Sequence, residues 1–257
     1  MIGCMDSSSS FPAENEAPAR VETMPRIDRR SIRAAWASGG PVIVWAIVIL
    51  CSLVWLAETL LRYFLPSLYS ALMLEGMFIP ALAVARPWTW LTALFLHAPT
   101  ILHVLFNMMT LWMVGPVLER MLGHWRFLAV YLICGLGGAV GMVVWSRITG
   151  DWTMAAYGAS GAIFGLFGVL LVVYRRIGED IRSLLIWIGI NIAMPFVISN
   201  VAWQAHVGGI VTGVVLSWLL AGGFPLLRGR SLALRTGIFG TAVVLALLAG
   251  AYACLAL

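Results

Sequence analysis

Apolar residues run almost without interruption through most of this chain, in stretches separated by short polar segments. A helix needs about 20 predominantly apolar residues to cross the hydrocarbon core of a bilayer. Seven stretches are long enough, at residues 41–58, 102–119, 127–146, 157–174, 183–201, 205–222 and 236–257. The pattern therefore predicts an all-α polytopic membrane protein with seven transmembrane helices.

The segment LYSALMLEGMFIPALAVARPW, between the first two stretches, is apolar but interrupted by Glu75, Gly76 and Pro80. We expect it to lie in the outer interface and not to span. Arginine placement supports this count, because with a cytoplasmic N-terminus thirteen of the sixteen basic residues, all arginines, lie on the cytoplasmic side. That excess is the positive-inside bias of membrane proteins. The same topology predicts an external C-terminus.

The composition along the chain predicts an N-terminal tail, a core and a C-terminal segment. Residues 1–38 are rich in Ser, Pro, Glu and Arg, without apolar periodicity, which predicts a disordered basic cytoplasmic tail. No signal-peptide core precedes residue 41, so the first helix is expected to be an uncleaved anchor, and a bacterial plasma membrane is the expected location. Residues 39–225 are predicted to form a six-helix core, and 226–257 a linker and a seventh transmembrane helix.

The composition argues against a soluble protein and against a nucleic-acid-binding protein. The 257 residues are 61% hydrophobic and only 11% charged, whereas soluble domains are about a quarter charged. The net charge of +5 lies between the apolar runs, so it indicates membrane orientation, and no nucleic-acid partner is expected. The four cysteines are scattered, without CxxC or metal-ligand spacing, and are interpreted as apolar fillers.

Small residues four apart recur in three of the predicted helices. The pairs are Gly137 with Gly141, Gly161 with Gly165, and Gly209 with Gly213. Such pairs allow helix backbones to approach closely in a lipid environment. They predict a tight bundle formed by the third, fourth and sixth helices.

Four polar residues inside the apolar stretches are candidates for chemistry, namely His103, Asn107, Ser160 and His206. Each also has an ordinary interpretation as a packing serine, a satisfied core histidine or an interhelical amide. The predicted depths of these residues in the membrane argue against a chance grouping of unrelated packing residues. Counting from the cytoplasmic helix ends at 1.5 Å per residue places Ser160, His103 and His206 about 22–24 Å up their helices, in one outer layer.

Together these residue types provide the nucleophile, the base and the hydrogen-bond donors that acyl transfer requires. An imidazole can take the proton from the Ser160 hydroxyl and return it to a leaving amine. His103 and Asn107 are four apart, so they share a helix face and could stabilise an oxyanion. No acidic residue is expected in a spanning segment near His206, so a Ser-His dyad is predicted in a pocket that water enters from outside.

The glycines around the serine have an expected role. Gly158 and Gly161 are predicted to leave bare backbone where a substrate strand approaches closely. If the helix begins near Ser160, its free N–H groups and positive dipole end point at the same oxyanion.

The chain resembles the rhomboid intramembrane serine proteases over about residues 41–225. GASGAIFG matches the family's GxSG element and AHVGGIVTG its sixth-helix pattern, which imply Ser160 as nucleophile and His206 as base. HVLFN matches the HxxxN element, which implies His103 and Asn107 as oxyanion donors. Phe164 falls where the family places an aromatic ring against the histidine. The resemblance implies a six-helix rhomboid-like bundle plus the seventh helix, and no cofactor or metal.

The first external loop departs from the family pattern. RPWTWLTALFLHA has Trp88, but Thr89 stands where the family often has arginine, and nearby Arg86 is a possible substitute. The segment from His97 to His103 is one residue longer than is common. His97 is expected to be structural, and His124, in the cytoplasmic turn, is given no role.

The resemblance also implies the partners. Transmembrane protein substrates are expected to enter sideways from the lipid bilayer, near the second and fifth helices, where NIAMPFVISNVAWQ contains Pro195 and Trp203. A catalytically inactive rhomboid-like protein that binds membrane clients is one alternative, although both dyad members are present and Ala159, not proline, precedes the serine. A small transporter is another, although no clear internal repeat is found.

Overall fold

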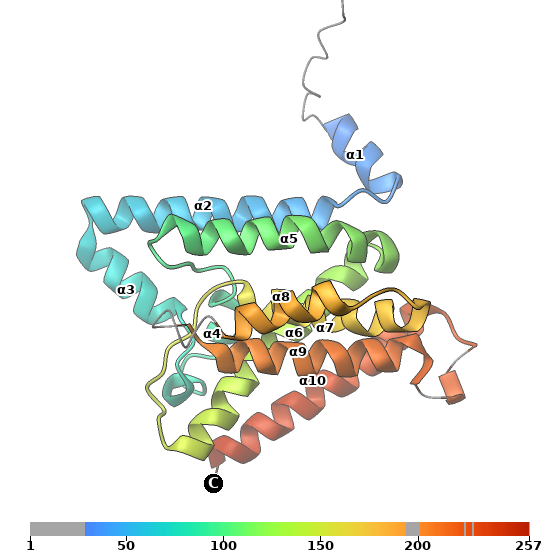
Figure 1. The fold of residues 1–257 in the computed structure, drawn as a ribbon. Coiled ribbons are helices and arrows are strands. Elements are labelled where there is room, and N and C mark those ends of the chain that lie inside the picture. Colours follow the sequence, from blue (N-terminus) through green and yellow to red (C-terminus); the bar gives the residue numbers. More distant parts are fainter. Residues whose placement is uncertain (1–28, 194–200, 224, 228, 257) are drawn as a thin grey trace, which may run out of the picture.

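The chain folds into a bundle of helices, and the computed structural model describes residues 29–193, 201–223, 225–227 and 229–256 (Figure 1). The long helices are α1 (Arg29–Ala37), α2 (Val42–Phe64), α3 (Pro66–Gly76), α5 (Ile101–Leu122), α6 (His124–Thr149), α7 (Ser160–Ile177), α8 (Arg182–Ala193), α9 (Trp203–Trp218) and α10 (Leu232–Ala256). A short helix, α4 (Thr89–Thr92), precedes α5. Within these ranges extended backbone pairs only at an isolated antiparallel bridge between Phe78 and Ala156, so the fold is all-α.

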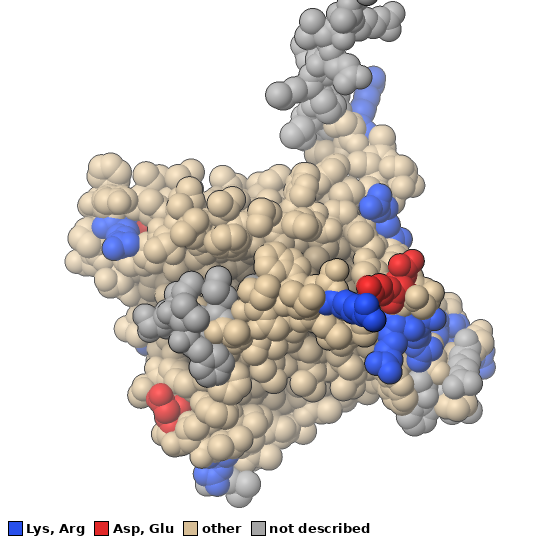
Figure 2. Space-filling view, in the orientation of Figure 1, with Lys and Arg blue, Asp and Glu red and all other residues tan. Residues whose placement is uncertain are grey.

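Six of the described helices are long and apolar enough to cross a membrane. They are Val42–Phe64, Ile101–Leu122, His124–Thr149, Ser160–Ile177, Trp203–Gly222 and Leu232–Ala256. Figure 2 shows charged side chains near the ends of the bundle and an uncharged band between them on the visible face. The predicted all-α polytopic membrane fold is confirmed.

The fifth predicted span, 183–201, is described only in part. Helix α8 covers Arg182–Ala193, and residues 194–200, including Pro195, lie outside the described residues. Trp203 is the first residue of α9 and does not belong to the fifth helix. Its ring lies 4.8 Å from that of Trp145 on α6, and the expected gate near Pro195 and Trp203 stays a prediction.

The interrupted segment after α2 does not span. Helix α3 has only 11 residues and descends obliquely from the end of α2 (Figure 1). Arg86 holds its last turn by donating to the Leu74 carbonyl at 2.5 Å and pairing with Glu75 at 2.9 Å. The indole of Trp88 donates to the Glu75 carbonyl at 2.8 Å. We refer to this part of the molecule as the α3 end of the bundle.

Helices α7 and α9 touch through backbone atoms. A Cβ placed at Gly209 would lie 2.0 Å from the carbonyl oxygen of Gly161, and one at Gly213 would lie 2.0 Å from that of Gly165. Real Cβ atoms do not approach that closely, so only glycine permits this packing. In lipid, where apolar burial does not drive helix association, such van der Waals contact holds helices together.

Helix α6 closes the same group from another side. A Cβ at Gly137 would collide with the hydroxyl of Thr212 at 2.0 Å, and one at Gly141 would lie 2.5 Å from the Gln204 carbonyl. Both partners are on α9. The predicted tight bundle of the third, fourth and sixth helices is therefore confirmed as α6, α7 and α9.

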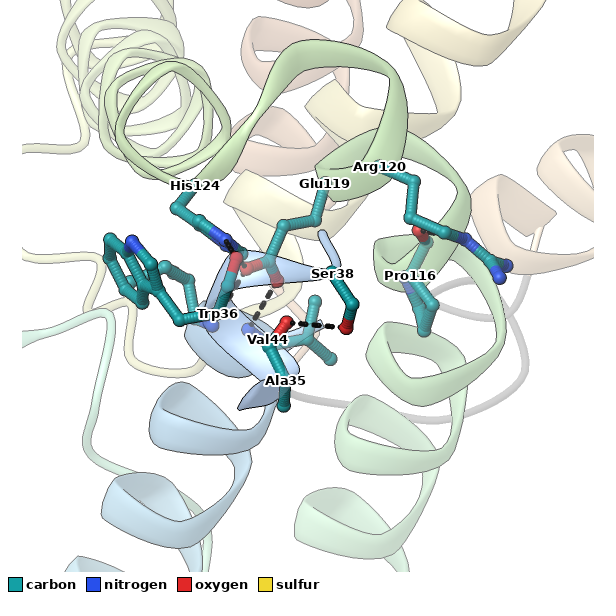
Figure 3. A network of polar contacts seen from close by, with 9 residues as sticks. Ala35, Trp36, Ser38, Val44, Pro116, Glu119, Arg120 and His124 are labelled. Atoms are coloured by element: carbon teal, nitrogen blue, oxygen red, sulfur yellow. Dashed lines mark hydrogen bonds and ion pairs between the residues drawn. The ribbon is translucent and has the colours of Figure 1, made fainter. Parts of the chain in front are cut away.

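Helix α2 packs beside α5, and a carboxylate joins them at the end away from α3 (Figures 1 and 3). Glu119 of α5 accepts the backbone N–H groups of Ile43 and Val44 at 2.9 Å each. First-turn N–H groups have no partner inside their own helix. Glu119, 1% exposed, therefore caps α2 from the neighbouring helix.

The end of the predicted disordered tail is helical. Residues 1–28 lie outside the described residues, but Arg29–Ala37 form α1. The Trp36 ring stacks on that of His124 with centroids 4.0 Å apart, and the Trp36 carbonyl lies 3.0 Å from His124 Nε2 (Figure 3). The segment Arg29–Ala37 is amphipathic and contacts α6 through Trp36, so the structure differs from the expectation of disorder and absent periodicity at these nine residues.

A Gly213→Ala substitution is expected to lower the free energy of unfolding by about 1–3 kcal/mol, because the added methyl group overlaps the backbone of Gly165. Thermal unfolding in detergent measures the change. The matched control is Gly237→Ala on α10, where nothing lies within 4 Å of the added Cβ. Equal stability of the two variants would contradict the proposed packing constraint.

Candidate active site

Ser160 is the first residue of α7, at the α3 end of the bundle. The first N–H groups of a helix lack intrahelical partners, and the helix dipole makes that end positive. The Ser160 side chain is half-buried, next to these donors. The local structure therefore places a hydroxyl group where negative charge is stabilised.

Gly158 allows the chain to turn into this helix. Its φ of 122° is a conformation that side chains disfavour. A Cβ there would lie 3.0 Å from Cε1 and 3.1 Å from Nε2 of His103, and 3.9 Å from Ser160 Oγ. The missing side chain thus leaves the space between the His103 ring and the Ser160 hydroxyl.

His206 on α9 reaches Ser160. Its Nε2 lies 3.0 Å from Ser160 Oγ, and the ring is buried, with 5% exposed. The Phe164 ring, one helical turn after Ser160, stacks on the imidazole with centroids 4.0 Å apart and planes within 6°. Nδ1 of His206 has no hydrogen-bond partner among the described residues. Aromatic stacking therefore orients this imidazole in place of a carboxylate.

The Nε2 atom of His103 faces the space between Gly158 and the Ser160 hydroxyl. The Ala98 N–H donates to His103 Nδ1 at 2.9 Å, so this nitrogen carries a lone pair. In the neutral ring the proton is then on Nε2, the atom that faces Gly158 and Ser160. His103 Nε2–H is a donor aimed at the gap beside the hydroxyl.

Asn107 lies one turn further along α5 and is buried. Its amide donates to the His103 carbonyl at 2.8 Å. The structure therefore places it on the His103 side of the helix, as predicted, with one N–H used inside α5. The second N–H of this amide is the one that an oxyanion role requires.

Gly161 has the helix-packing role predicted for it and not the second expected role, that of backbone beside a substrate strand. It is buried, and a Cβ there would lie 3.5 Å from the carbonyl and 3.8 Å from the Cβ of Ala205 on α9. The prediction of bare backbone open to a substrate strand is wrong for Gly161, because this face of α7 packs against α9.

Two other histidines lie apart from the Ser160–His206 contact. His97 is fully buried, with Nδ1 3.0 Å from the Phe95 carbonyl. Burial, and to a lesser extent nearby His103, lower the pKa of His97 to about 4, so the ring is neutral at pH 7. His124 lies at the opposite end with Glu119, far from Ser160.

The sequence reasoning missed Glu58. The apolar pattern predicts a first span that ends at this residue, but α2 continues to Phe64, so Glu58 lies inside a membrane span. It is 1% exposed and accepts the His97 N–H, with oxygens 3.2 and 3.4 Å away. The apolar residues after it, including Leu60 and Leu61, were the available signal.

A cavity of about 400 Å³ lies elsewhere, between α6, α9 and α10. Trp145, Trp203 and Leu247 are among its lining residues, and neither Ser160 nor His206 is. The water-filled pocket expected beside the serine stays a prediction. Among the described residues, no group of three or more His, Cys, Asp or Glu side chains could hold a metal ion.

Comparison with known proteins places this arrangement in a family. The rhomboid domain model matches residues 84–223, more than half of the chain, and this range includes all seven predicted site residues. The chain belongs to the rhomboid family. Helix α2 and helix α10 lie outside the matched range.

Relatives from bacteria and plants share this region. YdcA of Bacillus subtilis (strain 168), which is named as a rhomboid protease, is 40% identical over 137 residues, covering 51% of this chain and 66% of YdcA. Rhomboid protease GluP of the same organism is 39% identical, covering 49% of this chain and 24% of GluP. RHOMBOID-like protein 4 of Arabidopsis thaliana is 33% identical, covering 52% of this chain and 34% of that protein. The chain thus spans less than two thirds of the length of these relatives.

The predicted protease activity should fall about 10²-fold in a Gly158→Ala variant, because the new methyl group displaces the His103 ring. The control is Gly178→Ala, which also has a positive φ, 77°, but nothing within 4 Å of the added Cβ. Gly178→Ala should lose about 1–2 kcal/mol of stability from backbone strain, and Gly158→Ala at least as much. Initial rates of reporter cleavage compare them, and equal activity losses would contradict the assigned role of the space at Gly158.

Proposed function

We propose that the chain is an intramembrane serine endopeptidase that hydrolyses peptide bonds in or near transmembrane segments of other membrane proteins. The observation that carries this proposal is the 3.0 Å contact between Ser160 Oγ and His206 Nε2, at the positive end of a helix. Membership of the rhomboid family supports the same activity. Transmembrane protein substrates are the partners that follow from it.

The first half of the reaction forms an acyl-enzyme. Ser160 Oγ attacks the scissile carbonyl carbon while its proton passes to His206 Nε2. The carbonyl oxygen becomes negative and is stabilised by the Ser160 backbone N–H, His103 Nε2–H and the free N–H of Asn107. Collapse of the tetrahedral intermediate breaks the C–N bond, and His206 returns the proton to the leaving amine.

The second half releases the acyl group. A water molecule gives a proton to His206 Nε2 as its oxygen attacks the ester carbonyl, and the same donors hold the oxyanion. His206 then protonates Ser160 Oγ as the C–O bond breaks, which regenerates the hydroxyl and frees the carboxyl product. The stacked Phe164 ring keeps the imidazole in place through both halves.

Lateral entry of substrate is proposed beside α5. Leu102, Leu105 and Phe106 on this helix are exposed apolar residues near His103 in sequence, as a surface facing lipid requires. A substrate helix must unwind at the cleavage site, because its carbonyl groups are otherwise hydrogen-bonded within the helix.

Substitution of either dyad member tests the proposed activity. Purified protein in lipid vesicles with a transmembrane reporter substrate is expected to cleave it, and Ser160→Ala and His206→Ala should each reduce the rate at least about 10³-fold. A serine-reactive fluorophosphonate should modify Ser160, as mapped by mass spectrometry.

The outcomes separate the candidate functions. Cleavage that survives Ser160→Ala would eliminate the proposed nucleophile. A wild-type chain that binds the reporter without cutting it would identify the inactive, client-binding class instead.

We also propose that the α3 end faces the exterior and that the N-terminal end of α2 faces the cytoplasm. Arg175, Arg176 and Arg182 cluster where α7 ends and α8 begins, as the positive-inside rule requires of a cytoplasmic side. Near the end of α10, Cys254 and Leu255 pack with the cluster around Phe78, which places that helix end on the Ser160 side.

Single cysteines in a cysteine-free background test this orientation. Asp151→Cys, in the exposed loop before α7, should react with a membrane-impermeant maleimide in intact cells. Glu179→Cys, in the exposed turn after α7, should react only after lysis. The reverse labelling pattern would overturn the proposed topology, and the lysed sample controls for the intrinsic reactivity of each site.

A further inference from the structure

We propose that Glu58 and Trp55 of α2 are positioning residues for the oxyanion donor His103, acting through the backbone of the His97–Ala98 turn. This inference rests on the proposed function for its catalytic meaning. The proposal gives a role to Glu58, a buried acidic residue in a membrane span that takes no part in the reaction itself.

The burial of Glu58 calls for an explanation. An ionisable side chain within a transmembrane segment is costly and is usually paired or functional. Glu58 is 1% exposed, and its carboxyl oxygens accept the His97 N–H at 3.2 and 3.4 Å. Either protonation state of the side chain provides an acceptor oxygen, so this contact does not require a charge.

Trp55 holds the next residue of the same turn. It is three residues before Glu58, so the two side chains share a face of α2. Its indole Nε1–H donates to the Ala98 carbonyl at 3.2 Å. One helix face therefore binds a backbone donor of His97 and a backbone acceptor of Ala98.

The turn is also braced from within. The His97 side chain is fully buried, and its Nδ1–H donates to the Phe95 carbonyl at 3.0 Å. The low pKa of His97 keeps this ring neutral at pH 7, so Nδ1–H is its only ring N–H. Besides the contact with His103, the backbone from Phe95 to Ala98 thus has side-chain contacts from His97, Trp55 and Glu58.

The held turn selects the tautomer of His103. The Ala98 N–H donates to His103 Nδ1 at 2.9 Å, which leaves the ring proton on Nε2. Nε2 lies beside Gly158, in the space next to Ser160 Oγ. Without the Ala98 donor, the proton could occupy Nδ1 and the ring would present a lone pair to the developing oxyanion, which is repulsive.

The test uses variants that remove one contact each. Glu58→Leu removes the acceptor at similar volume, Glu58→Gln keeps an acceptor oxygen, and Trp55→Phe removes only the indole N–H. The control is Glu119→Leu. Glu119 is also 1% exposed and accepts backbone N–H groups, but it acts on the opposite end of α2.

The first readout is the protonation pattern of His103, which does not depend on activity. The chain has four histidines, so ¹⁵N-histidine magic-angle-spinning NMR of the Ser160→Ala protein in bilayers can resolve their tautomers. His103 should be the Nε2–H form in this protein and in its Glu58→Gln and Glu119→Leu derivatives. Glu58→Leu and Trp55→Phe should add an Nδ1–H population.

The second readout is the kinetics of reporter cleavage in the Ser160-containing protein. Glu58→Leu should lower kcat about 10- to 100-fold with KM nearly unchanged, because His103 acts in the transition state. Trp55→Phe should lower kcat less, and Glu58→Gln should stay within a few-fold of wild type. Glu119→Leu should lose stability without this fall in kcat.

Two results would overturn the proposal. One is an unchanged His103 tautomer in Trp55→Phe and in every folded Glu58 variant. The other is an equal fall in kcat for Glu119→Leu at equal loss of stability. Absence of cleavage by the wild-type protein would instead refute the proposed function, and the NMR result would still decide whether Glu58 and Trp55 set the state of His103.

Discussion

The backbone contact between α7 and α9 is the constraint on which the site depends. The carbonyl of Gly161 lies against Gly209, and that of Gly165 against Gly213, so the contact repeats every four residues and sets the axial register. Ser160 directly precedes the first of these contacts on α7, and His206 is three residues before it on α9. A slip of one turn would move one side chain about 5.4 Å along its partner and separate the hydroxyl from the imidazole.

The start of α7 is held on its other side by the irregular segment at the α3 end. Phe78 and Ala156 exchange two backbone hydrogen bonds of 2.9 Å, and the Gly158 N–H donates to the Ala93 carbonyl at 2.8 Å. Non-helical backbone near the membrane needs such partners, because an unsatisfied polar group in hydrocarbon is costly. The same bonds that satisfy the loop therefore place Gly158 between His103 and Ser160.

A buried glutamate makes backbone contacts near each end of α2, and the two contacts have different effects. Glu119 reaches it from α5 and satisfies its first-turn N–H groups, which joins two helices. Glu58 belongs to α2 itself and reaches outward to the His97 backbone. Both are 1% exposed, so burial alone does not distinguish a helix cap from a side chain that holds a loop next to the candidate site.

The sequence alone predicted the six membrane spans that the structure describes and the glycine contacts between them, because hydropathy and helical periodicity act locally along the chain. It could not determine that Gly161 faces Ala205, that α1 forms against His124, or that the amide of Asn107 bonds the His103 carbonyl. It also did not reveal Glu58 as a partner of His97, 39 positions away. Only the tertiary structure decides such pairings, because the direction of a side chain around its helix has meaning only once the neighbouring helix and loop are in place.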